Sequence, residues 1–460
     1  MSTTNPLSSL SSALSTSGSG TTSGTGLGQG IDVQAFVQFA VADQTAAITA
    51  LQNQQTTLGS QTSELTTITN DITSLGNAAA ALSDPLGALA AEAATSSNSS
   101  VVNATASGTA VTGSHSITVT SLATTSSYYT NELATNSATI APGSFQIQVG
   151  SNTPVTITVD STNDTLSQLA ASINNQNAGV TASVIQDANG YRLALVSNNS
   201  GAPGDITIPG NTTSLSFTKA VTGTNASLVV DGVPISSASN TVSNVISGVT
   251  LNLGSASPNT PVTVSVSPDT TQATTAINNF VTAYNTVVAD FNSQFNVSSD
   301  GSGGGPLEAD NSLSDAQGAL LNAISYSVSG NDGIVNLASL GISLNNDGTL
   351  SVDNGALSSA LSSNYSAVQN LLQNTTNGFA QNLTNVINSI TDPSSGILTL
   401  DAQSIQSTSQ NLTQQISDLQ AALTVQEQNL TTVYSNVNTT LQELPLLENE
   451  TSQQLSAITS

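Results

Sequence analysis

The sequence has no cysteine, no tryptophan and a single histidine, His115, among its 460 residues. Without cysteine the chain can form neither a disulfide framework nor a thiolate nucleophile, and one histidine cannot supply a pair of imidazole ligands to a metal ion. A Ser/His/Asp set also requires an oxyanion hole, and no Gly-x-Ser-x-Gly elbow is present. These absences predict a protein that is not an enzyme and has no cofactor, with His115 in a structural role.

Basic residues are almost missing. Lys and Arg together number 2 against 28 Asp and Glu, which leaves a formal net charge of -26. Binding to nucleic acid or to an anionic membrane surface requires cations, so both are excluded. Charged residues nevertheless total 7%, far below the ~25% of an ordinary soluble domain, so the surface must consist mainly of amides and hydroxyls. No apolar run approaches 18 residues, so no membrane insertion is expected.

The first 30 residues are rich in Ser, Thr and Gly and contain no Lys or Arg. Such a segment cannot bury enough apolar area to order itself, so we expect residues 2 to 30 to be disordered when alone. It also lacks the basic start and the apolar stretch of a secretory signal peptide. The chain is therefore expected either to stay in the cytoplasm or to leave by a route that reads a disordered N-terminus.

Helix-forming sequence follows, with apolar positions spaced by alternate threes and fours. No proline occurs between Ile31 and Pro85, and Asp32 is suited to the first turn, so we predict one continuous helix from Asp32 to Ser83. At ~1.5 Å per residue it would be about 75 to 80 Å long, which is typical of a rod and not of a compact globule. The seam runs through Ile48, Leu51, Gln55, Leu58, Thr62, Leu65, Thr69 and Ile72.

The C-terminal end carries a second seam of the same spacing. It consists of Leu412, Ile416, Leu419, Leu423, Gln426, Leu430, Val433 and Val437. Pro445 is expected to break or kink this helix and to start a short terminal helix, because proline lacks the N–H and clashes with the preceding turn. We predict that the two seams pair with each other. The alternative is that each packs on its own domain core.

Between residues 98 and 268 the apolar period changes to two, which predicts half-buried strands bounded by Gly, Pro, Asn and Asp. One helix, Thr165 to Asn174, interrupts them, capped by Asp164 or Thr165. Helix is predicted again from Thr271 to Phe295, followed by a glycine-rich break at residues 300 to 306. A hairpin is predicted at Gly341 to Val352, turning at Asn346-Asp347-Gly348.

The predicted fold class is α+β and multidomain, with long terminal coiled-coil helices, a helical body and an inserted β-rich head. The expected parts are a disordered N-terminus and leg helix (1–45), the body (46–95 and 271–411), the β-rich head (96–138 and 222–270), an inserted outer head (139–221) and a C-terminal coiled-coil leg (412–460). Length allows three or four domains at roughly 150 residues each.

Several segments in this order resemble the flagellar hook-associated protein 2 family, the filament caps. Gly30-Ile-Asp-Val-Gln-Ala-Phe-Val37 is similar to its N-terminal signature, and Gly113-Ser-His-Ser-Ile-Thr-Val-Thr-Ser-Leu-Ala123 to its first head strands. Asp231-Gly-Val-Pro-Ile-Ser-Ser237 resembles its middle region. Phe280-Val-Thr-Ala-Tyr-Asn285 and Asp347-Gly-Thr-Leu350 resemble its body. The resemblance covers nearly the whole chain.

The resemblance implies a ring-shaped homo-oligomer, pentamer or hexamer, at the extracellular tip of the bacterial flagellum. It implies that the ring promotes folding and insertion of exported flagellin and prevents its loss. Further implied partners are hook-filament junction proteins and a type III export chaperone on the C-terminal helix, with export through the flagellar type III apparatus. The interaction residues expected in the legs are Val33, Phe36, Val37, Ile48, Leu51, Leu58, Leu65, Ile72, Leu412, Ile416, Leu419, Leu423, Leu430, Val433 and Val437.

One alternative function stays open from the sequence. A secreted adhesin or fibre with a glycan-binding β head would share the hydroxyl-rich composition and the two terminal helices. Isolated fibres would indicate this alternative, whereas rings on filament tips would indicate the cap.

Overall fold

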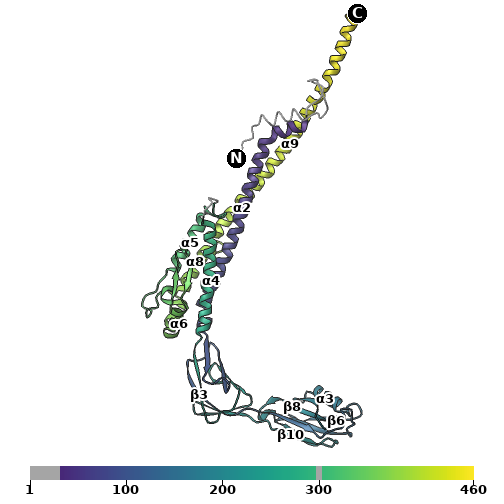
Figure 1. Ribbon diagram of the computed structural model, residues 1–460, viewed down its shortest axis with the longest axis vertical. Coiled ribbons are helices and arrows are strands. Elements are labelled where there is room, and N and C mark those ends of the chain that lie inside the picture. Colours follow the sequence, from purple (N-terminus) through teal and green to yellow (C-terminus); the bar gives the residue numbers. More distant parts are fainter. Residues whose placement is uncertain (1–31, 297–302, 460) are drawn as a thin grey trace.

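The computed structural model describes residues 32–296 and 303–459. The predicted disorder of residues 1 to 30, and part of the predicted glycine-rich break, lie outside these ranges. The described chain forms an elongated molecule with paired helices at one end, a helical body in the middle and two β-rich heads at the other end (Figure 1). The predicted fold class is confirmed.

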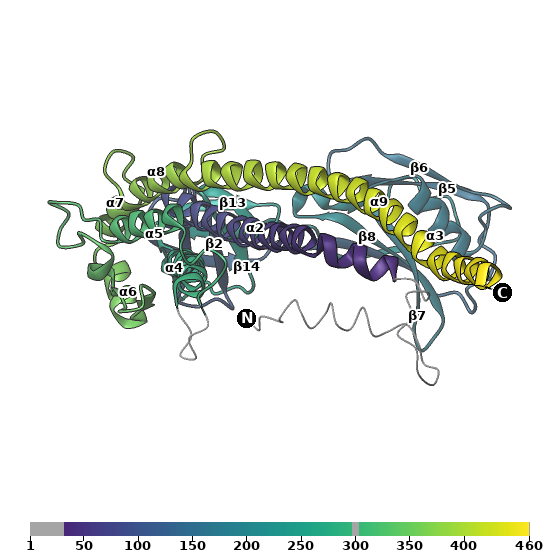
Figure 2. The same ribbon diagram turned by 90° about the horizontal axis from the view of Figure 1, so that it is seen from above.

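Two long helices form the rod. Helix α2 (Val33–Ser83) begins at Asp32, whose carboxylate accepts a hydrogen bond from the Ala35 N–H at 3.1 Å and so caps the first turn. Helix α9 (Ile397–Thr459) runs back alongside it, and Figure 2 shows the two helices side by side. Most of their threonine hydroxyls donate to the carbonyl four residues earlier, as Thr62 does to Leu58 at 2.9 Å, so these polar groups are satisfied within their own helix.

Pro445 does not end α9, which continues as one helix to Thr459. The predicted separate terminal helix is therefore wrong. A proline removes only one helical hydrogen bond, here the one to the carbonyl of Leu441, which is half-buried. The flanking Leu444 and Leu446 are exposed, so this stretch of the helix lies in water. Figure 2 shows that α9 curves along its C-terminal half.

The body packs shorter helices against the lower halves of α2 and α9. Its aromatic centre includes Phe280 and Phe379, whose rings meet edge to face with centroids 5.5 Å apart. The predicted hairpin is present as a two-stranded sheet that ends in this core. The body elements are α4 (Thr270–Phe295), α5 (Asn311–Ile324), η3 (Leu337–Leu340), β16 (Ile342–Leu344), β17 (Leu350–Val352), α6 (Asn354–Ser363), α7 (Tyr365–Gln373) and α8 (Phe379–Thr391).

The inner head is built from two antiparallel sheets with a common apolar core. The larger sheet has the strand order β1-β15-β3-β11-β12, and the smaller has β13-β14-β2. Alternating residues point inward, as the burial of Ile117 and Val119 in β3 shows. The strands are β1 (Glu92–Ser96), β2 (Val102–Ala106), β3 (Gly113–Ser121), β11 (Ala226–Val230), β12 (Val233–Ser237), β13 (Thr241–Ile246), β14 (Val249–Leu253) and β15 (Val262–Pro268), preceded by η1 (Ala88–Ala90).

The outer head contains a sheet of order β10-β4-β8-β7, a smaller sheet β6-β5-β9 and helix α3. Helix α3 (Leu166–Asn175) begins at Thr165, one of the two predicted caps, and buries Leu169 and Ile173. The other elements are β4 (Thr125–Thr130), β5 (Gly143–Val149), β6 (Val155–Val159), β7 (Val180–Gln186), β8 (Tyr191–Ser200), η2 (Ala202–Gly204), β9 (Ile206–Thr207) and β10 (Phe217–Val221).

One strand lies in a different head from the one predicted. The sequence pattern predicts the segment 96–138 in the inner head, but β4 pairs with β8 and β10 in the outer sheet, so residues 125–130 belong to the outer head. An alternating strand pattern shows that one face is buried but not which sheet contains the strand. The other domain boundaries stay predictions.

Candidate assembly surface on the leg helices

The seam between α2 and α9, which we call the leg seam, is a small apolar cluster. Ile48 packs against Leu412 and Ile416, and all three side chains are buried. Leu51 and Leu423 are half-buried against them. This contact joins residues more than 350 positions apart in the sequence and holds α9 alongside α2.

A polar residue inside the seam is satisfied across it. Gln55 donates from Nε2 to the Thr413 hydroxyl at 2.7 Å. A hydrogen bond between side chains of two helices favours one register over its neighbours, because a slip along the seam would leave the amide without this partner. Gln55 therefore aligns α9 on α2.

The seam continues towards the start of α2. Phe36 meets Tyr434 with ring centroids 5.7 Å apart, and Val37 and Val41 are buried beside them. Val33 is half-buried at the edge of a groove of about 590 Å³ that opens between the helices. The seam thus extends over the first turns of α2, although the packing there is less complete.

Two predicted seam residues lie elsewhere. Leu65 and Ile72 are fully buried in the body core, and Leu58 lies between that core and the leg seam. The structure therefore corrects the prediction that Leu65 and Ile72 face the C-terminal leg. Their spacing continues the heptad, but α4 and α8 cover this stretch of α2, and an apolar stripe does not specify which partner buries it.

On α9 the residues predicted for the seam are only partly the residues that face α2. Leu430 is half-buried, but Leu419, Val433 and Val437 are 42%, 54% and 43% exposed. A straight helix drifts by roughly 20° per heptad relative to a 3.5-residue repeat, so the contact moves to a neighbouring column. Tyr434, next to Val433, makes the contact with Phe36 instead.

The heptad spacing does not predict Tyr434 or Val41 as seam residues. For Tyr434 the available signal in the sequence is the rarity of aromatics, which are 3% of the chain.

The displaced residues leave apolar surface in water. Val433 and Val437 continue along α9 into Leu444 and Leu447, which are 46% and 62% exposed. Four such side chains on one helix are more than an isolated exposed leucine, which would require no explanation. We call these four residues the exposed leg stripe.

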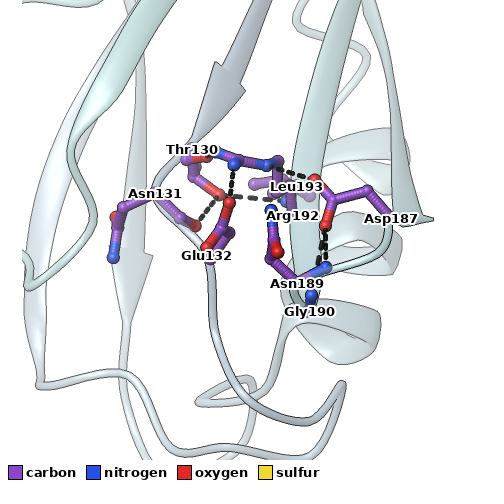
Figure 3. Close-up of polar contacts among 8 residues, drawn as sticks. All are labelled: Thr130, Asn131, Glu132, Asp187, Asn189, Gly190, Arg192 and Leu193. Atoms are coloured by element: carbon purple, nitrogen blue, oxygen red, sulfur yellow. Dashed lines mark hydrogen bonds and ion pairs between the residues drawn. The ribbon is translucent and has the colours of Figure 1, made fainter.

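The outer head contains both basic side chains, and Figure 3 shows the first of them. Arg192, on β8, donates from Nε to Asp187 at 2.8 Å and from Nη1 to the Thr130 carbonyl at 3.0 Å, and it pairs with Glu132. Its guanidinium also lies 5.3 Å from the centre of the Tyr129 ring. The hydrogen bond from Arg192 lowers the pKa of Asp187.

Lys219, on β10, pairs with Asp205 through Nζ at 2.8 and 3.0 Å. Burial raises the pKa of Asp205, but the hydrogen bonds from Lys219 and the Gly223 N–H outweigh it, so the net pKa is lowered. Both cations therefore join strands or loops of the outer head. They are structural, since each is occupied by carboxylates of the same head.

His115 lies on β3 of the inner head, with Nδ1 2.8 Å from Asp231. The same carboxylate accepts from the Ser116 N–H at 2.8 Å, and these contacts, the one from His115 first, lower the pKa of Asp231. Among residues 32–296 and 303–459, no group of three or more His, Cys, Asp and Glu side chains could hold a metal ion. In the same ranges no helix is long and apolar enough to cross a membrane.

Family models match most of this architecture. Residues 29–126 match the flagellar hook-associated protein 2 N-terminus, residues 223–445 match the flagellar hook-associated protein 2 C-terminus, and residues 144–199 of the outer head match the flagellin hook IN motif. The first two models together cover more than half of the chain.

Individual relatives agree. The B-type flagellar hook-associated protein 2 of Pseudomonas aeruginosa is 34% identical over 55% of this chain and 60% of its own length. The flagellar hook-associated protein 2 of Escherichia coli K12 is 28% identical over 68% of this chain and 72% of its own. The crystal structure of the D1-D2-D3 domains of the E. coli flagellar cap protein FliD superimposes with a TM-score of 0.56 at 29% identity, covering 75% of this chain and 99% of that one. The chain belongs to the flagellar hook-associated protein 2 family, the flagellar filament cap proteins.

Proposed function

We propose that this chain, a filament cap protein by family, assembles into a ring at the distal end of the bacterial flagellar filament with its heads as a plate and its legs directed into the filament. The observation that supports this arrangement is the separation of roles along the rod. The heads are hydroxyl-rich β units at one end, whereas the other end carries a thin leg seam and the exposed leg stripe (Figure 1).

The physical argument concerns what covers the legs. Burial of apolar surface stabilises by roughly 25 cal/mol per Å², so the exposed leg stripe favours any assembly that removes it from water. Copies of the same chain arranged in a ring place their legs next to one another, and each then covers its neighbour's stripe. The ring is thus favoured over the monomer by the part of the molecule that is least complete alone.

Flagellin is the partner that such a cap would serve. Subunits arriving at the tip would fold and insert beneath the plate, and the plate would prevent their loss. We further propose contacts with hook-filament junction proteins before the filament grows, an export chaperone on the C-terminal part of α9, and export through the flagellar type III apparatus.

The proposed role requires no catalysis. His115 is the one imidazole of the chain. Its contact with Asp231 joins β3 to the turn between β11 and β12, which fits a structural residue. The alternative of a glycan-binding fibre is not proposed, since no observation on the described residues favours it.

A truncation tests the proposal in a bacterium whose own cap gene has been deleted. A chain lacking residues 425–460 removes the exposed leg stripe, together with the proposed chaperone-binding part of α9, but leaves the heads and the body core. Added to the cells as purified protein, so that export is not required, it should be folded but restore no filaments and let monomeric flagellin escape into the medium. The full-length chain is the positive control and should restore filaments. Normal filaments from the truncated chain would refute the role of the legs.

A point variant gives a sharper comparison. Val433→Asp with Val437→Asp places charge on the exposed leg stripe, whereas Thr432→Asp with Asn436→Asp adds the same charge one residue away, on exposed positions outside it. The first pair should abolish capping and the second should largely preserve it. Equal loss from both pairs would indicate a general effect of charge and contradict a specific apolar contact.

A further inference from the structure

Two pairs of carboxyl groups lie where the long helices join the body. In the first pair, Asp290 on α4 lies against Asp71 on α2, and Glu64 of α2 is the next carboxyl to it. The Oδ2 atom of Asp290 is buried and has no hydrogen-bond partner. Glu64 is itself held by Gln294, whose Nε2 donates to Oε2 at 3.3 Å. No other charged group from the elements packed on α4 acts on Asp290.

The second pair joins α9 to α5. Asp401 on α9 lies against Asp310, and its buried Oδ2 atom again lacks a partner. Asp310 is the cap of α5, where its Oδ1 accepts from the Leu313 N–H at 2.9 Å. This cap hydrogen bond fixes the Asp310 carboxylate at the start of α5.

Neither basic side chain of the protein neutralises either pair. The chain has only Arg192 and Lys219, and both are bound to carboxylates in the outer head. A buried carboxyl oxygen without a donor, beside a second carboxyl, gains a hydrogen-bond partner when a proton is shared between the two groups. With that proton the pair is a hydrogen bond between helices; without it the pair is two like charges at close range.

We propose that these shared protons clamp α4 to α2 and α9 to α5, so that the body is tightened by mild acid and loosened at neutral or higher pH. The two clamps act where α2 and α9, the helices of the leg seam, meet the body helices α4 and α5. The device therefore regulates how firmly the legs are anchored in the body, and it is independent of the proposed capping role.

The direction follows from linkage. Burial, first, and the neighbouring carboxyls, second, raise the pKa of both Asp290 and Asp401 to about 6. A group whose pKa is raised on folding stabilises the folded chain fully at pH values below its pKa in the unfolded chain, near 4. This stabilisation is lost as the pH rises through the pKa of the folded chain. The window of change is thus pH 4 to 7, with the tighter body on the acid side.

Hydrogen exchange at pH 5.0 and pH 7.5, corrected for the intrinsic pH dependence of exchange, tests this in the full chain. Peptides from α4 and from the body part of α9 should be protected roughly tenfold more at pH 5.0, a figure reduced from the full shift because both carboxyls are partly solvated. Asp290→Asn and Asp401→Asn imitate the protonated state, so each should keep the high protection at pH 7.5 in its own helix.

Asp418→Asn is the matched control. Asp418 is exposed on α9 and accepts a hydrogen bond from Gln414 on the same helix, so this variant should retain the wild-type pH response. The proposal is overturned if wild-type body peptides are equally protected at both pH values, or if the two Asn variants respond to pH as the wild type does.

A second measurement does not depend on the variants folding. In wild-type protein carrying 13C at aspartate carboxyls, two resonances should titrate near pH 6, apart from the bulk of the aspartates. Absence of any aspartate titrating above pH 5 would also overturn the proposal, whatever the exchange data show.

Discussion

The outer head depends on one half-buried arginine, Arg192. The guanidinium of Arg192 contacts three groups at once (Figure 3). They are the Asp187 carboxylate at a strand end, the Thr130 carbonyl and the Glu132 carboxylate in a loop. A planar fork can satisfy several acceptors with one charge, whereas the ammonium of lysine is a point charge with different directions. The sequence shows that cations are scarce, but it does not show which carboxylates surround them, since Glu132 is 60 residues away.

Substituting this residue should affect the outer head alone. We expect Arg192→Gln to lower the melting temperature of the outer head, Arg192→Lys to lower it less, and both to leave the inner head and body unchanged. Thermal unfolding followed by hydrogen exchange of β4 and β8 peptides measures the effect. Thr218→Ala, an exposed change on β10, is the control. A drop in protection spread over all domains would contradict a local role.

At the scale of elements, sequence periodicity predicts that the two legs pair, but it does not predict which seam residues are buried. The prediction that two seams at opposite ends of the chain pair is confirmed by the contact of Ile48 with Leu412 and Ile416. The heptad treats Leu412 and Leu419 as equivalent, but the first is buried and the second is 42% exposed. Only the rotation of α9 about its axis, which depends on body packing, distinguishes them.

This difference is directly measurable. Leu412→Ala should destabilise the pairing of α2 and α9 by about 2 kcal/mol, at the lower end for a buried leucine because the seam is narrow. Leu419→Ala should change it by less than about 0.5 kcal/mol, as at an ordinary surface position. The readout is hydrogen exchange of residues 40–55 in the monomer. Because the seam contains few buried side chains, these peptides should already be weakly protected in the wild type; strong protection would show that the legs are stable alone.

At the scale of the whole molecule, net charge dominates. With 28 Asp and Glu against 2 Lys and Arg, neighbouring copies repel one another at neutral pH. The repulsion falls as exposed carboxylates are protonated, at a pH of about 4 to 4.5. Association of the chain should therefore strengthen on acidification from pH 7 to pH 4.5.

Sedimentation at these two pH values, each at low and at high salt, measures this association. Salt screens exposed charges and should imitate part of the acid effect at pH 7. If the oligomer fraction is the same under all four conditions, carboxylate repulsion does not govern assembly. An Asp290→Asn, Asp401→Asn double variant should associate like the wild type, because the exposed carboxylates that produce the repulsion are unchanged.

The sequence by itself determined the elements and their order, because these depend on local physical properties. The cap at Asp32, the alternation in β3 and the turn at Asn346-Asp347-Gly348 all act within a few residues. Tertiary structure alone decided which partner each element meets. In the folded chain Leu65 and Ile72 are buried in the body core, β4 pairs within the outer head, and Asp290 lies against Asp71. An apolar stripe or a carboxylate carries no information about what will cover it until distant segments pack together.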